Sequence, residues 1–234
     1  MKVLVINSSP HFDKGTTGGI LAPFMEGMES AGVEVEILYA SRLDVKPCLG
    51  CLKCWDTSPG KCIQDDDMQD LLPKIADADV LVLATPVYVD GMTAPMKAII
   101  DRMVPLIHGT FEIRDDHCRH PIREGVKRGK LVLVSPCGFT EMDNFDPLVA
   151  HVKAICKNMS REYAGALLRP YGWYFPVLAR RGLPVERVLD ACRKAGAQLI
   201  LDGRFSEDVL REVSADLVPR DEVVEQMRSH YGDR

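Results

Sequence analysis

Short apolar segments alternate with amphipathic segments along most of this chain of 234 residues. Residues 3–6, 80–84 and 131–134 are apolar throughout, which is typical of strands buried on both faces of a sheet. Residues 33–39 alternate apolar with acidic side chains and predict a strand nearer the sheet edge, and residues 164–168 predict a fifth strand. Strands that alternate with helices form parallel sheets, so we expect an α/β fold with helices on both faces.

The segments between these strands carry apolar residues at helical spacing. Helices are predicted around residues 20–32, 65–75, 93–103 and 148–156, and two or three more close the chain, over residues 185–201, 206–213 and 221–231. Asp65 or Asp66 is expected to cap the second of these helices, and Thr93 the third. We expect one main domain over residues 1–203 and a C-terminal helical extension over 204–234. A polar insertion, residues 105–128, interrupts the main domain and is expected to form a lid or a subunit contact.

Composition excludes several classes of protein. The formal net charge is −5 and no long basic run is present, which argues against binding to nucleic acid. No window approaches 18 uninterrupted apolar residues, so we expect no membrane span. The N-terminus is typical of a core strand and not of a signal peptide, so we expect a cytoplasmic protein whose thiols are reduced.

Four of the eight cysteines lie close together in the sequence, at Cys48, Cys51, Cys54 and Cys62. The first three have the Cys-x-x-Cys-x-x-Cys spacing of many iron–sulfur proteins, and a Pro-Gly turn brings the fourth back toward them. A [4Fe–4S] cluster held by all four is one interpretation. The others are a packed turn with free thiols or an opportunistic disulfide, and a structural zinc site.

Three loops are expected at one edge of the predicted sheet, where parallel sheets bind ligands. The loop over residues 7–17 carries Ser9, Thr16 and Thr17 just before a helix, whose N-terminal N–H groups favour a phosphate. The loops over residues 85–95 and 135–144 offer aromatic and small residues that suit a flat heteroaromatic ring.

Two of these loops carry a resemblance to a known family. The segment SSPHFDKGTT resembles the phosphate loop of the flavodoxin-like NAD(P)H-dependent FMN reductases, although His11 replaces the common arginine and Thr16 the common asparagine. The segment TPVYVDGMTAPMKAIIDR resembles the loop of that family that contacts the flavin ring, with its following helix. The cysteine segment, with residues 65–68 after it, resembles the iron–sulfur flavoproteins of the same superfamily.

The resemblance implies a flavodoxin-like three-layer sandwich with strand order 2-1-3-4-5 and bound FMN. The implied FMN-binding residues are Ser9, His11, Thr16, Thr17, Pro86, Val87, Tyr88, Cys137, Gly138 and Phe139. Because free imidazole is mostly neutral near pH 7, His11 weakens charge pairing with the phosphate. We expect no catalytic nucleophile, since the flavin carries the hydride and electron chemistry.

Two functions follow as expectations. The first is an oxidoreductase that passes electrons from NAD(P)H through FMN to a small acceptor such as a quinone or a flavin. The second is an iron–sulfur flavoprotein that accepts electrons from ferredoxin through a [4Fe–4S] cluster on the four cysteines. The resemblance also implies a homo-oligomer, either a homodimer or a homotetramer.

Overall fold

The computed structural model describes residues 1–232, whose centre is a five-stranded parallel sheet. Its strands are β1 (Val3–Asn7), β2 (Val35–Tyr39), β3 (Val80–Ala84), β6 (Lys130–Pro136) and β7 (Glu162–Arg169). They lie in the order β2-β1-β3-β6-β7, which confirms the predicted order 2-1-3-4-5. The half-buried strand β2 lies at one edge, as its alternating sequence predicts.

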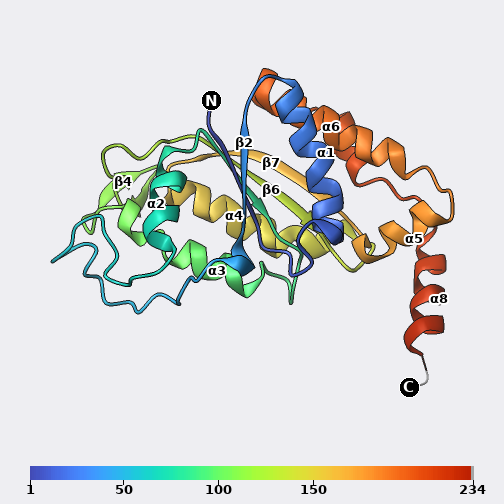
Figure 1. Cartoon of the computed structure of the whole chain (residues 1–234), viewed down its shortest axis with the longest axis horizontal. Helices are drawn as coiled ribbons and strands as arrows, with labels where there is room; N and C mark the ends of the chain where they lie inside the picture. Colours follow the sequence, from blue (N-terminus) through green and yellow to red (C-terminus); the bar gives the residue numbers. More distant parts are fainter. Residues whose placement is uncertain (233–234) are drawn as a thin grey trace.

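Helices cover both faces of this sheet, so the predicted three-layer architecture is confirmed (Figure 1). Alternate residues of β1 point to opposite faces. Leu4 and Ile6 pack in one core with α2 (Met68–Asp77), α3 (Ala94–Asp101) and α4 (Asp146–Asn158). Val3 and Val5 pack in a second core with α1 (Thr16–Ser30), α6 (Val185–Leu201) and α7 (Glu207–Val213).

Some elements differ from the sequence prediction. The insertion over residues 105–128 contains a small antiparallel hairpin, β4 (Glu112–Arg114) with β5 (His117–Arg119), which its polar sequence did not indicate. The short helix α5 (Phe175–Arg180) was also missed. It packs in a third, smaller core with α8 (Arg220–Tyr231), which extends away from the sheet (Figure 1).

The predicted division into residues 1–203 and 204–234 stays a prediction, and residues 233–234 lie outside the described part. Within residues 1–232, no helix has both the length and the apolar character that crossing a membrane requires.

Helices α1 and α6 cross at two glycines. A Cβ atom added to Gly27 would lie 1.9 Å from the carbonyl oxygen of Arg193, and one added to Gly196 would lie 2.0 Å from that of Phe24. Because both obstacles are backbone atoms, neither can move aside without shifting a helix. The two glycines therefore allow a backbone approach that any larger residue would prevent.

This crossing predicts opposite effects for two glycine-to-alanine substitutions. Gly196→Ala should lower the free energy of unfolding by about 1–3 kcal/mol, the usual cost of overpacking. Gly19→Ala, at an exposed position of α1 where the added methyl group meets no atom within 4 Å, should raise it by up to about 1 kcal/mol because alanine favours helix. Urea denaturation followed by circular dichroism measures both, and equal stabilities would contradict the close crossing.

Candidate functional site

A pocket of about 250 Å³ lies at the carboxyl ends of the parallel strands. It is lined by Ser9, His11, Thr16, Thr17, Pro86, Val87, Tyr88, Pro136, Cys137, Gly138 and Trp173. Every residue that the sequence suggested for FMN lies here except Phe139, which lines a neighbouring groove with residues of α8. Loops more than 120 residues apart in the sequence thus form one hollow, as expected for the ends of parallel strands.

The first wall of the pocket is the loop between β1 and α1. The side-chain oxygen of Asn7 accepts a hydrogen bond from the Ser9 N–H at 2.9 Å and tightens the turn. Gly15 occupies the N-cap position of α1, and no side chain caps this helix. The first N–H groups of α1 are therefore available to a ligand, and the helix dipole favours an anion there.

Gly15 is also required for the compact shape of this loop. A Cβ atom at this position would lie 2.8 Å from the Cβ of His11 and 3.2 Å from the Oγ of Ser9. The hydroxyl of Thr16 donates to the carbonyl oxygen of Gly172 at 2.7 Å. Since that hydroxyl hydrogen is already engaged, the backbone N–H is what Thr16 can offer to a ligand.

A buried set of hydroxyl groups joins the first loop to the loop after β3. The Thr93 hydroxyl donates to the Ser8 hydroxyl at 2.7 Å, and the Thr93 N–H donates to the Thr85 hydroxyl at 3.1 Å. Thr93 does occupy the N-cap position of α3, but its side chain makes no capping hydrogen bond, so the predicted side-chain cap is wrong. The hydroxyl fixes the two pocket walls relative to each other instead.

The loop after β3 presents Tyr88 on a strained turn. Tyr88 and Gly91 exchange backbone hydrogen bonds of 2.9 and 3.1 Å, and the two residues between them, Val89 and Asp90, have φ angles of 47° and 61°. Positive φ is rare for a β-branched residue such as Val89, which is fully exposed. Backbone strain of this kind is common at ligand sites.

Two residues of the pocket, Pro136 and Trp173, are not among the predicted FMN-binding residues, and Trp173 lies in a loop that the prediction did not include. Its indole N–H donates to the carbonyl oxygen of Gly138 at 3.0 Å and joins the loop after β7 to the loop after β6. The signal was present, because Trp173 follows the fifth parallel strand and the rule for strand ends includes that loop. Burial raises the pKa of the Cys137 thiol in the same wall, so this thiol stays neutral near pH 7.

The four clustered cysteines line a second cavity, of about 330 Å³. Cys48 and Cys51 are exposed, whereas Cys54 and Cys62 are half-buried. All four are free thiols, and burial raises the pKa of Cys54. In the described residues, no three His, Cys, Asp or Glu side chains are grouped so that they hold a metal ion. The structure therefore brings the predicted ligands to one cavity without forming a closed ligand shell.

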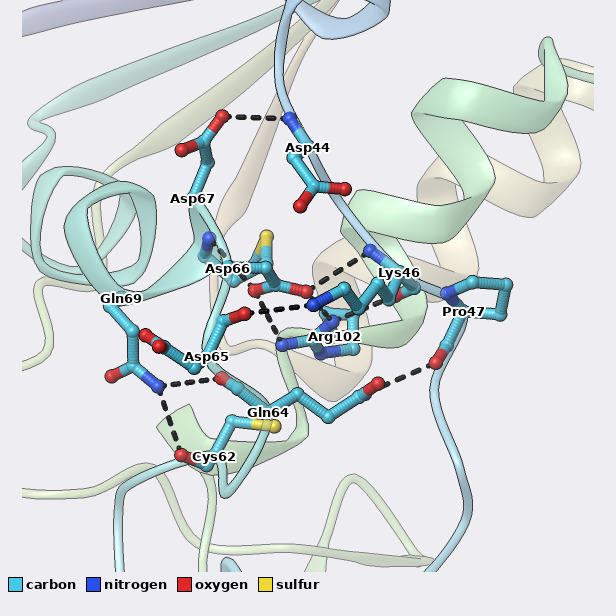
Figure 2. A network of polar contacts seen from close by, with 11 residues as sticks. Asp44, Lys46, Pro47, Cys62, Gln64, Asp65, Asp66, Asp67, Gln69 and Arg102 are labelled. Atoms are coloured by element: carbon cyan, nitrogen blue, oxygen red, sulfur yellow. Dashed lines mark hydrogen bonds and ion pairs between the residues drawn. The ribbon is translucent and has the colours of Figure 1, made fainter.

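A polar network closes the base of the cysteine loop, residues 48–62 (Figure 2). The Asp67 carboxylate accepts from the Asp44 N–H at 2.7 Å, and the Gln64 amide donates to the carbonyl oxygen of Pro47 at 3.1 Å. The Asp66 carboxylate accepts from the N–H of Lys46 at 3.0 Å. The segment that enters the loop is thus bonded directly to the segment that leaves it.

Arg102, just after α3, completes this network as a buried cation (Figure 2). Its guanidinium donates two hydrogen bonds to Asp66, of 2.6 and 2.9 Å, and one to the carbonyl oxygen of Lys46 at 2.7 Å. Burial alone would raise the pKa of Asp66, but hydrogen bonds from Arg102 and from backbone N–H groups lower it overall. Burial would likewise lower the pKa of Arg102, which Asp66 and Cys62 raise overall.

Asp66 has a further role at the start of α2. Its Oδ1 atom accepts from the Met68 N–H at 3.2 Å, although Asp67 occupies the N-cap position and makes no side-chain capping bond. The predicted caps were Asp65 or Asp66. Asp66 does accept from a helix N–H group while it pairs with Arg102, although the N-cap position belongs to Asp67.

The insertion packs against the cysteine loop. The rings of His120 and Trp55 lie 4.7 Å apart, and the Arg123 guanidinium donates to the carbonyl oxygens of Pro105 and Cys54 at 2.9 and 3.1 Å. Residues 105–128 thus support one side of the loop. Their predicted role as a lid or a subunit contact stays a prediction.

One family model matches the N-terminal half of the chain. The family model described as NADPH-dependent FMN reductase matches residues 1–119. An iron–sulfur flavoprotein of Methanocaldococcus jannaschii is 34% identical over 115 residues, which are 49% of this chain and 58% of that protein. An iron–sulfur flavoprotein of Archaeoglobus fulgidus is 37% identical over 108 residues, 46% of this chain and 48% of that protein. The chain spans about half the length of the curated relatives it matches.

Solved structures share the fold at lower identity. An NAD(P)H:quinone oxidoreductase from Methanothermobacter marburgensis superposes with a TM-score of 0.60 at 19% identity, covering 85% of this chain and 96% of that one. An FMN-dependent NADH-azoreductase from Bacillus anthracis, solved in complex with FMN, gives 0.60 at 14% identity, covering 85% and 99%. The family match extends over half the chain, from β1 through the β4–β5 hairpin, so this protein belongs to the NADPH-dependent FMN reductase family.

Proposed function

We propose that this protein binds FMN in the pocket at the strand ends and passes electrons from NAD(P)H through it to a small acceptor such as a quinone or a flavin. The observation that carries the proposal is the make-up of the pocket. An uncapped helix N-terminus forms one wall, and two loops that suit a flat ring form the other. The solved azoreductase with FMN has the same fold, which supports the choice of cofactor.

The residues present fit FMN. The N-terminal N–H groups of α1 and the hydroxyl of Ser9 would hold the phosphate, which needs several donors and favours the positive end of the helix dipole. The flavin ring would lie between the loops of Tyr88 and Gly138. An added Cβ at Gly138 would meet no atom within 4 Å, so the loop leaves open space beside its backbone.

When bound, FMN supplies the hydride and electron chemistry. The chain would bind and orient it, and the side chains of Tyr88 and Trp173 line the pocket that would hold it. We assign no catalytic acid, base or nucleophile to the chain. The neutral thiol of Cys137 acts as part of the pocket wall.

A second candidate function is electron transfer through a [4Fe–4S] cluster on Cys48, Cys51, Cys54 and Cys62, with ferredoxin as the donor. It is supported by the cavity that the four thiols share and by a buried atom beside them, the Nε of Arg102, which has no hydrogen-bond partner. The iron–sulfur flavoproteins among its relatives support the same choice. The cysteine loop would have to contract around the cluster, because it forms no closed ligand shell alone.

Replacing His11 tests the position of the phosphate. His11→Arg adds a positive charge at the pocket, so it should tighten FMN binding about 2- to 5-fold, as an exposed ion pair worth up to about 1 kcal/mol would. The gain should disappear at high salt. Quenching of flavin fluorescence measures the affinity, and His151→Arg, on α4 away from the pocket, is the matched control. Equal affinities for the two variants would contradict the assignment.

Anaerobic mixing with NADH or NADPH tests the reaction itself. The FMN-loaded protein should lose its flavin absorbance rapidly with one of them, and regain it when a quinone is added. An FMN-loaded protein that neither nucleotide reduces would exclude the oxidoreductase proposal while leaving FMN binding intact.

Iron analysis separates the two candidate functions. After anaerobic reconstitution with iron and sulfide, the protein should retain both, and Cys51→Ser or Cys62→Ser should abolish retention. Cys118→Ser, in the exposed β5 strand, should leave it unchanged. Retention of FMN without iron would rule out the electron carrier, and zinc in place of iron would indicate a structural site.

A further inference from the structure

Arg102 has one N–H group with no partner although the side chain is almost fully buried. Its side chain is 1% exposed, and its terminal nitrogens bond to Asp66 and to the carbonyl oxygen of Lys46. The Nε atom is buried and has no hydrogen-bond partner. Buried donors are nearly always paired in folded proteins, so an exception on a charged group requires an explanation.

The surroundings of this atom are rich in sulfur. Arg102 lines the same cavity as the four clustered cysteines, and it interacts closely enough with Cys62 for this thiol to contribute to its raised pKa. The cavity wall also includes Leu49, Ile63 and Pro105. Its other polar side chains, Gln64 and Asp101, are paired with Pro47 and Lys97 and not with the Nε atom. We therefore expect the acceptor of the Nε–H group to be a sulfur atom, from one of the cysteines or from a group that they bind.

Asp66 fixes the orientation of the Arg102 guanidinium. Asp66 binds the outer edge of the guanidinium through both carboxylate oxygens, and Asp66 is itself held by the N–H groups of Lys46 and Met68. A bidentate pair of this kind fixes the plane of the guanidinium as well as its position. Because Asp66 also balances its charge, the arginine can stay buried without a bound anion.

We propose that the Nε–H group of Arg102 donates a hydrogen bond to a thiolate or sulfide sulfur of a [4Fe–4S] cluster in this cavity and thereby raises the reduction potential of the cluster. The inference rests on the second function proposed above. One-electron reduction makes the cluster and its thiolates one charge more negative. A hydrogen bond to sulfur stabilises the reduced form more than the oxidised form, and such bonds set cluster potentials. Arg102 would contact the cluster directly, and Asp66, which acts through Arg102, is the positioning residue.

The test is a redox titration of the reconstituted protein with dithionite, followed by electron paramagnetic resonance. The double variant Asp66→Asn/Arg102→Gln removes the Nε–H group and leaves the pair with the same net charge, so it avoids an unpaired buried carboxylate. At a fixed applied potential, the ratio of reduced to oxidised cluster should fall about tenfold, which for a one-electron couple is a shift of about 59 mV. Arg102→Lys, which has a cation but no Nε–H, should shift it in the same direction.

Arg123→Lys is the matched control. Arg123 also supports the cysteine loop, but its hydrogen bonds go to the carbonyl oxygens of Pro105 and Cys54. Its replacement should reduce iron retention at most and leave the potential unchanged. A purely structural role for Arg102 would give this same result.

The outcomes separate the inference from the function on which it rests. A wild-type protein that retains no iron would overturn both. A wild-type protein with a cluster whose potential stays the same in both Arg102 variants would overturn the inference alone. Loss of iron from both variants, with FMN still bound, would also overturn it and leave Arg102 as a structural support.

Discussion

The parallel sheet is the constraint on which the rest of the molecule depends. The central residues of β1, β3 and β6 are buried on both faces and are apolar, and each strand is followed by a helix that returns the chain to the edge where the strands begin. Polar residues are confined to the ends of these strands, as Asn7, Lys130 and Ser135 are, and to the loops that follow them. Both cavities described above begin in those loops, one after β1, β3, β6 and β7, and the other after β2.

Sequence patterns predicted the parts of the fold that burial controls. Residues 80–84 and 185–201 match the observed β3 and α6 at both ends, because the switch from apolar to polar residues marks their limits. The hairpin β4–β5 and helix α5 were missed for a common reason. Each is too short to show periodicity, and tertiary contacts such as those of Phe175 with the third core stabilise them.

The sequence could predict those parts of the candidate site that lie in loops directly after the parallel strands. The loops that hold Ser9, Tyr88 and Gly138 could be placed from the sequence, and the structure brings them into one pocket. The roles of Asp66 and Arg102 could not, because their pairing spans 36 residues and joins two elements that show no pattern in common. In the sequence Asp66 resembles an ordinary helix cap. Its ion-pair partner, Arg102, lies 36 residues further along the chain, just after α3.

Helix α3 acts as a spacer of fixed length between the two cavities. Thr93 at its start is hydrogen-bonded to the loop that forms the pocket at the strand ends, and Arg102 just past its end lines the cysteine cavity. Eight helical residues span about 12 Å, and a helix cannot stretch or shorten without breaking its hydrogen bonds. Inserting one residue would also rotate everything beyond it by about 100° and turn Arg102 away from Asp66. The helix therefore fixes the distance between Thr93 and Arg102, and a change of its length by less than a whole turn would misplace one of the two contacts.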